Sequence, residues 1–215
     1  MNKRKISIIA AIVILAIVAY FGVTQYQSYQ EEVLTESFNK NLQNASAIEA
    51  NLISSTEKFN NRPSTDVDEL MNTINNDMSP KYAEELNVLN KTYESTNNDT
   101  KKQYINLQMK RIELSSKNLN GTVTTLNAIS QLYKGEKSQE DAQTAINNAN
   151  KDITDSSNEL NSVLTDIKTL LKQNPDFDQS LRGLHLEKSF YGETQQQPQN
   201  ITNTTNTTNT TNNTQ

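Results

Sequence analysis

Cysteine and tryptophan are absent from this chain of 215 residues, and histidine occurs once, at His185. Without cysteine there can be no disulfide framework, no thiolate metal site and no thiol nucleophile. Turn-forming residues are also scarce, with only five glycines and four prolines. Because an all-β sandwich needs a turn roughly every 8–12 residues, this scarcity favours an all-α fold built from a few long helices.

The residue patterns of catalytic and cofactor sites are missing as well. A di-iron bundle needs Glu-x-x-His on two helices, which one histidine cannot supply, and His185 alone is typical of a surface or packing residue. The sequence contains no Gly-rich phosphate loop, Ser-His-Asp set or calcium loop. The acidic pairs Glu31–Glu32, Glu84–Glu85 and Glu140–Asp141 fall on predicted outer faces or first turns. We therefore expect no enzyme, no catalytic residue, no cofactor and no metal.

Positive charge is concentrated at the N-terminus. The net charge is −5, yet the first 30 residues hold Lys3, Arg4 and Lys5 and no Asp or Glu. The rest of the chain is acidic and lacks a basic stripe, so we expect no nucleic-acid partner.

Residues 6–24 are predicted to form a transmembrane anchor. They form an apolar run of 19 residues without a charge, or about 28 Å of helix, which matches a bilayer hydrocarbon core of roughly 30 Å. By the positive-inside rule, the basic tip at residues 1–5 stays in the cytoplasm and everything after residue 24 lies outside the cell. The expected localisation is the cell membrane, with a single pass and an extracellular C-terminus.

Two other interpretations of the apolar run stay open. A cleaved signal peptide would have its best site after Ala19, but Ile17 is a poor fit to the small residue required there. A buried core helix is disfavoured because no other segment is apolar enough to surround it.

The C-terminal residues 194–215 contain no charged residue and consist almost entirely of Gln, Asn, Thr and Pro. Such a composition cannot bury enough apolar surface to offset its ordering entropy, which predicts a disordered tail. The tail repeats the N-x-[ST] pattern of N-glycosylation sites. The candidate acceptors are Asn200, Asn203, Asn206, Asn209 and Asn212, with weaker candidates at Asn44, Asn90, Asn98 and Asn120.

The repeated pattern in the tail also has explanations without glycans. Codon bias toward Asn can scatter such tripeptides by chance, and replication slippage can produce a tandem repeat that has no function. The threonines are equally suited to O-glycosylation. Under each explanation the tail is a solvated spacer.

The middle of the chain, residues 25–173, is predicted to form an extracellular antiparallel bundle of four helices. The expected helices are 25–61, 66–97, 100–134 and 138–173, where apolar residues recur at spacings of three and four. In the third helix these positions are Ile105, Met109, Ile112, Ser116, Leu119, Val123, Leu126, Ser130 and Tyr133. Residues 95–100 lack Gly and Pro, so a three-helix fold with one long rod is the alternative.

Several local signals mark where these helices begin and end. Thr100 and Gln103 fit a capping box, Gly135 a left-handed stop and Ser138 the next N-cap. Successive spacings of four surround Pro80, where a proline should kink or restart the helix. Residues 174–193 are expected to form an irregular strap that docks on the end of the bundle.

Four predicted core positions are polar, and they suggest two roles. These positions are Asn41, Ser116, Ser130 and Ser156. They can line a small-molecule cavity between helices, or they can thin the core and fix the helical register.

The overall layout resembles single-pass envelope proteins that carry a helical ectodomain, a resemblance that assigns no residue a role. It implies a non-enzymatic, membrane-anchored surface protein whose bundle makes structural or protein–protein contacts with other envelope proteins or with a wall or glycan layer. The alternative is an extracellular ligand-sensing or accessory subunit that acts through a membrane partner, since only about five residues face the cytoplasm.

Overall fold

A computed structural model describes residues 33–61 and 66–193, and within these ranges every regular element is helical. The first helix is described from residue 33 to residue 60. The later elements are α2 (Val67–Thr73), the π-helix η1 (Ile74–Met78), α3 (Ser79–Glu94), α4 (Asp99–Tyr133), α5 (Gln139–Gln173), α6 (Pro175–Arg182) and the 3₁₀-helix η2 (Lys188–Tyr191). The predicted all-α class is confirmed for this part of the chain.

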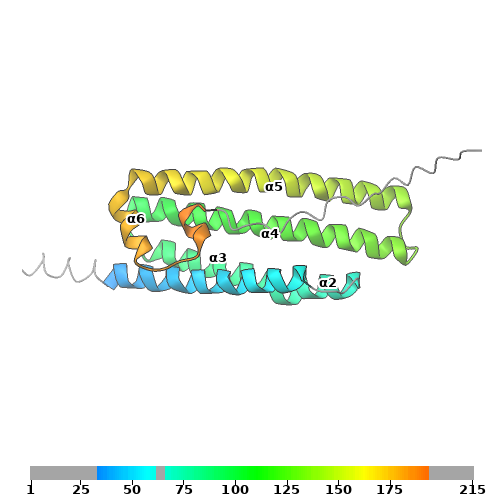
Figure 1. The fold of residues 1–215 in the computed structure, drawn as a ribbon, viewed down its shortest axis with the longest axis horizontal. Coiled ribbons are helices and arrows are strands. Elements are labelled where there is room, and N and C mark those ends of the chain that lie inside the picture. Colours follow the sequence, from blue (N-terminus) through cyan, green and yellow to red (C-terminus); the bar gives the residue numbers. More distant parts are fainter. Residues whose placement is uncertain (1–32, 62–65, 194–215) are drawn as a thin grey trace, which may run out of the picture.

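The long helices lie side by side as a bundle (Figure 1). The first helix is followed by a rod made of α2, η1 and α3, and then by the antiparallel pair α4 and α5. Residues 95–98 are not helical, so α3 and α4 are separate helices and do not fuse into the single long rod considered above. We call the end that carries α6 the strap end, and the end where α4 joins α5 the distal end.

The start of α4 differs from the expected capping box at Thr100 and Gln103. Asn98 is the N-cap, and its side-chain oxygen accepts the backbone N–H of Lys101 at 3.0 Å. The amide of Asn98 reaches this free N–H three residues ahead, so the helix begins earlier than the Thr100 pattern suggested.

The turn between α4 and α5 follows the expected chemistry. Gly135 has φ +72°, and its N–H donates to Leu132 O at 3.1 Å while Glu136 N–H donates to Gln131 O at 2.9 Å. This pair of bonds is a Schellman motif, which favours glycine at the left-handed position. Ser138 then caps α5 by accepting the backbone N–H of Asp141 at 3.1 Å.

The spacing of four around Pro80 corresponds to a change of helix type. Residues Ile74–Met78 form a π-helix, whose wider turn keeps Ile74 and Met78 buried on one face. The α-helix restarts at Ser79 and places Pro80 in its first turn, a position where proline is tolerated.

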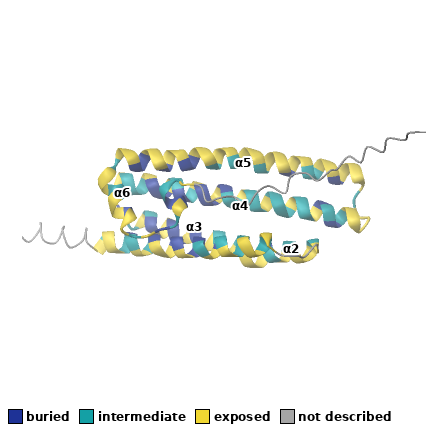
Figure 2. Cartoon of the chain, in the orientation of Figure 1, coloured by how far each residue is buried: buried dark blue, intermediate teal, exposed yellow. Residues whose placement is uncertain are grey.

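The core is uneven along the bundle axis. Figure 2 shows the buried residues concentrated toward the strap end. A cluster of 17 buried residues there includes side chains from the first helix, α3, α4, α5 and the strap, whereas a second cluster holds only Leu52, Ile74 and Met78. Tyr133 was expected in the core but is 84% exposed, because α4 ends there at the distal tip.

Residues 174–193, which we call the strap, are more regular than expected. They form α6 and η2, and they bury Leu181, Leu186 and Phe190 against the bundle. Phe177 meets the ring of Tyr104 edge-on, with ring centroids 5.3 Å apart. The strap therefore adds apolar side chains to one end of the bundle.

No helix within residues 33–61 and 66–193 combines the length and apolarity needed to cross a bilayer. The basic tip at 1–5, the anchor expected at 6–24 and the tail at 194–215 lie outside the described residues.

Candidate functional site

The polar core positions singled out in the sequence do not meet in one place. Ser130 donates to Asp68 at 2.8 Å, while Ser156 donates to Asn118 and to the carbonyl of Asp152 in its own helix. Asn41 lies on the first helix and Ser116 on α4, and both are half-buried. These residues make separate local contacts and form no common cavity wall.

The other residues named from the sequence are exposed. His185 lies in the strap with φ 54° and is exposed to solvent. The four weaker glycosylation candidates are exposed residues: Asn44, Asn90, Asn98 and Asn120. The stronger candidates Asn200, Asn203, Asn206, Asn209 and Asn212 lie outside the described residues.

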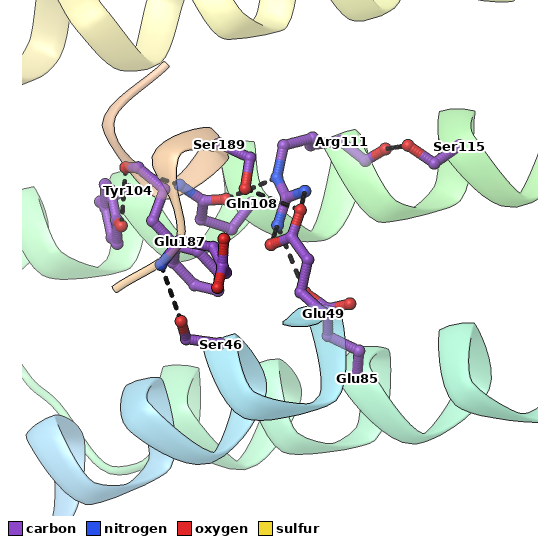
Figure 3. Close-up of polar contacts among 10 residues, drawn as sticks. Ser46, Glu49, Glu85, Tyr104, Gln108, Arg111, Ser115, Glu187 and Ser189 are labelled. Carbon is purple, nitrogen blue, oxygen red and sulfur yellow. Dashed lines mark hydrogen bonds and ion pairs between the residues drawn. The ribbon is translucent and has the colours of Figure 1, made fainter. Parts of the chain in front are cut away.

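A buried charged cluster is the main polar feature of the bundle, and α4 places its central residue. Arg111 is 4% exposed and binds Glu49 of the first helix with two parallel bonds, Nη1 to Oε1 at 2.6 Å and Nη2 to Oε2 at 2.8 Å. Its Nη2 also lies 3.2 Å from Glu85 Oε1 of α3, and its Nε donates to Gln108 at 2.8 Å. Figure 3 shows these side chains converging from three helices.

The strap closes one side of this cluster. Ser189 donates its hydroxyl to Glu49 Oε1 at 2.7 Å, and the Phe190 carbonyl accepts Tyr104 Oη at 3.0 Å and Gln108 Nε2 at 3.2 Å. The Phe190 ring lies 5.1 Å from the Arg111 guanidinium, within cation–π range. The strap thus adds a hydroxyl, a backbone carbonyl and an aromatic ring to the partners that the long helices supply.

A separate bond ties the strap to the first helix. The backbone N–H of Glu187 donates to the Ser46 hydroxyl at 2.8 Å (Figure 3). Glu49 lies one turn further along the same helix, so the two contacts hold the strap across the first helix and α4.

Glu85 is the incompletely bonded member of the cluster. It is fully buried, and while its Oε1 contacts Arg111, its Oε2 has no hydrogen-bond partner among the described residues. Burial raises the pKa of Glu85 to about 8; Arg111 opposes this increase, and the nearby charge of Glu49 adds to it. At neutral pH burial therefore favours the protonated form of Glu85, while Glu49 supplies the two-bond partner of Arg111.

Glu85 is one of the residues that line a cleft of about 590 Å³, and its unpartnered oxygen is buried behind the cleft surface. In Figure 3 one carboxylate oxygen of Glu85 points away from Arg111. The cleft lies between the first helix, α3, α4 and α5 and extends from the charged cluster toward the distal end. Its wall includes apolar and polar side chains, among them Leu52, Tyr82, Ser115, Asn118, Ser157 and Leu164.

The expectation that Glu84 and Glu85 both lie on an outer face is wrong for Glu85. Glu84 is exposed, but the next residue faces the bundle axis, where Arg111 offsets part of its desolvation. The sequence carries one signal for this cluster. Tyr104, Gln108 and Arg111 are spaced by four and three, so they share a helix face beside the predicted core positions.

Among the residues that the structure describes, no group of three His, Asp or Glu side chains could hold a metal ion. No protein-family model, no curated protein and no solved structure matches this chain. The role of the cluster and its cleft therefore has to be inferred from their geometry.

Proposed function

We propose that this chain is a non-enzymatic, membrane-anchored protein of the cell surface whose helical bundle binds a small ligand in the cleft beside Glu49, Arg111 and Glu85. The proposed anchor is the apolar run at residues 6–24, which follows Lys3, Arg4 and Lys5. This order of basic and apolar residues places the bundle on the outer side of the membrane.

The observation that carries the binding role is a buried ion cluster at the inner end of an open cleft. Buried ion pairs contribute little net stability, because desolvation offsets much of their attraction. A buried carboxylate oxygen without a partner costs about 1–3 kcal/mol more. Apolar side chains at these positions would stabilise the core at least as well as the ion cluster does. Polar groups that converge on a largely apolar cleft are typical of a ligand site.

The cleft favours ligand sensing over a purely structural role. In this proposal the signal of a bound ligand passes to the transmembrane helix of a partner. The first helix is suited to this coupling because it carries Glu49 and is the described helix nearest in sequence to the proposed anchor. In this proposal the protein is an accessory or sensory subunit in the envelope.

The proposed topology is tested by adding protease to intact cells and following the protein with an antibody against the bundle. We expect the bundle to be digested together with a known surface protein while a cytoplasmic protein survives. Survival of the bundle under these conditions would show that the proposed orientation is wrong.

The proposed binding role is tested by native mass spectrometry of the full chain extracted from its own membranes. We expect a bound small molecule that is lost in Thr122→Phe, which fills the cleft from α4. The matched control is Thr124→Phe, two residues along the same helix but exposed to solvent. Absence of any bound molecule, or equal occupancy in both variants, contradicts a ligand site in the cleft.

A further inference from the structure

We infer that the ligand of the cleft is an organic cation, in which an ammonium or guanidinium group binds the free carboxylate oxygen of Glu85 and an apolar body lies along the cleft toward the distal end. This inference rests on the proposed binding role and adds the chemical class of the ligand.

The first argument is the sign of the charge at the cleft wall. The charged residues that line the cleft are Glu49, Glu57, Glu85, Glu193 and Arg111. Each of the three guanidinium nitrogens of Arg111 already donates to a side-chain oxygen of Glu49, Glu85 or Gln108. Acidic side chains therefore outnumber the one arginine at the cleft wall, with Glu57 and Glu193 exposed and Glu49 and Glu85 buried, and the guanidinium already has partners. This balance favours a cation over an anion.

The second argument is the identity of the unpartnered atom. Glu85 Oε2 is buried and without a partner among the described side chains. A carboxylate oxygen accepts hydrogen bonds, and bonds from a charged N–H donor are among the strongest that it can accept. An ammonium or guanidinium group would neutralise the charge of this carboxylate and donate the hydrogen bond that Oε2 lacks.

The third argument is the apolar surface of the cleft beyond Glu85. Leu52, Leu119 and Leu160 line it from three different helices, and Tyr82 lies one turn from Glu85. A volume of about 590 Å³ lies within the usual range of small-molecule sites, roughly 300–1,000 Å³. A small inorganic cation would leave this apolar surface uncovered, whereas an alkyl or aryl ammonium covers it.

The cation would take the place of a proton. Burial raises the pKa of Glu85 to about 8, so near pH 7 the empty site holds a proton on this carboxyl. A cationic ligand binds the ionised form, and the cluster with its ligand is then neutral again. Each ligand that binds near pH 6 should release close to one proton, and fewer as the pH approaches 8.

The groups that face Glu85 set this proton exchange. They are Glu49 from the first helix, Tyr82 from its own rod and Arg111 from α4. Glu57 of the first helix and Glu193 of the strap line the same cleft. The residues of α5 that line the cleft carry no ionisable side chain. Burial also raises the pKa of Tyr82, to about 12, so Tyr82 stays neutral throughout the pH range of interest.

The test uses the full chain in lipid nanodiscs and calorimetric titration with n-hexylammonium chloride. The neutral probe of the same shape is 1-hexanol, and empty nanodiscs provide the baseline for partition into lipid. We expect hexylammonium to bind at least tenfold more tightly than hexanol at pH 8. Its affinity should rise about tenfold from pH 6 to pH 7 and level off above about pH 8, since one proton competes with it.

The decisive variants are Glu85→Gln and its neighbour Glu84→Gln, which is exposed. Glu85→Gln should weaken hexylammonium at least tenfold and abolish the pH dependence, while hexanol binding stays the same. Glu84→Gln should leave both probes unchanged. Titrations in two buffers of different ionisation enthalpy should show proton release for hexylammonium with the wild-type chain and none with Glu85→Gln.

Other results would overturn the inference and spare the proposed function. Equal affinity for hexylammonium and hexanol, or hexylammonium binding that persists in Glu85→Gln, would show that the cleft does not select a cation. The inference of a cationic ligand would also be wrong if neither probe bound, or if the molecule found by native mass spectrometry were neutral or acidic. The proposed binding function itself is contradicted only by the native mass spectrometry experiment that compares Thr122→Phe with Thr124→Phe.

Discussion

The two ends of the bundle are built from the same helices but packed in different ways. At the strap end, Leu181, Leu186 and Phe190 add a further set of side chains to a core that already includes Phe38 and Ile167. At the distal end no segment of the described residues covers the helices in this way, and few large side chains among them are fully buried there. The chain therefore concentrates its apolar packing at one end and leaves a cleft next to it.

The distal end compensates with small residues and close helix contacts. The buried positions of α5 in that half are Ala142, Ala149 and Ser156. Opposite them Gly121 lets α4 approach α5, since a Cβ at this position would lie 2.5 Å from Ile153 Cγ1. The comparison indicates that stability depends on large side chains at the strap end and on close backbone contact at the distal end.

The largest expected effect comes from removing the central charge at the strap end. Arg111→Met leaves Glu49 and Glu85 buried without their cation, which should lower the free energy of unfolding by about 3–5 kcal/mol. The control Lys110→Met breaks only a half-exposed ion pair with Glu159, so we expect less than about 1 kcal/mol. Urea unfolding followed by circular dichroism measures both, and similar losses would contradict a buried role for Arg111.

The second prediction compares one leucine from each end. Leu181 of the strap is 1% exposed, so Leu181→Ala should cost about 3 kcal/mol through lost burial and a cavity. Leu126 packs against the distal cluster but is only partly buried, and Leu126→Ala should cost about 1 kcal/mol. A larger loss for Leu126→Ala in urea unfolding would reverse the proposed difference between the two ends.

The third prediction follows the proton on Glu85. Its pKa rises from 4.5 to about 8 on folding, so the folded state holds a proton that the unfolded chain has released. The contribution of this proton to the free energy of unfolding is fully present below pH 4.5. It is lost as the pH rises to about 8, by at most about 1.4 kcal/mol per pH unit.

The difference in unfolding free energy between wild type and Glu85→Gln, measured from pH 5 to pH 9, isolates this contribution. We expect wild type to lose stability relative to Glu85→Gln up to about pH 8 and the difference to stay constant above that. Glu84→Gln should track wild type at every pH. A flat difference for Glu85→Gln would show that Glu85 is ionised throughout.

The smallest expected effect tests the close contact at the distal end. Gly121→Ala gains helix propensity but places its methyl group against Ile153, and the two effects leave a net loss of about 1 kcal/mol. In Ile153→Val the shorter side chain should relieve part of this clash, so the double mutant should lose less than the sum of the single changes. Additive losses in thermal unfolding would show that the helices are further apart at this level.

The fold was largely accessible from the sequence because its signals are local. The spacing of Ile105 and Ile112 indicated the buried face of α4, and Gly135 and Ser138 indicated the turn that follows it. The spacing around Pro80 indicated an irregular helix, although the pattern alone did not distinguish a π-helix from a kink. Asn98 was missed as a cap because Asn, Asp and Thr compete within the same six residues.

The charged cluster was not accessible in the same way. Glutamate and arginine are rarely buried unless they are paired, so Glu85 was assigned to the surface. The partners that permit burial come from three helices, and Ser189 and Phe190 come from a strap some 80 residues after Arg111. Local periodicity contains no information about partners that arrive from so far along the chain.

The large sequence separation between the strap and the first helix also determines the order in which contacts form as the chain is synthesised. Its contacts with the first helix join residues 140 and 141 positions apart, whereas the α4–α5 hairpin closes over a few residues. Distant contacts pay a larger loop-closure entropy and form more slowly than local ones. The inner wall of the cleft is therefore completed last, so in pulse-labelled hydrogen exchange the amide of Glu187 should gain protection after those of α4 and α5. A nascent chain has no complete cleft until its strap has emerged.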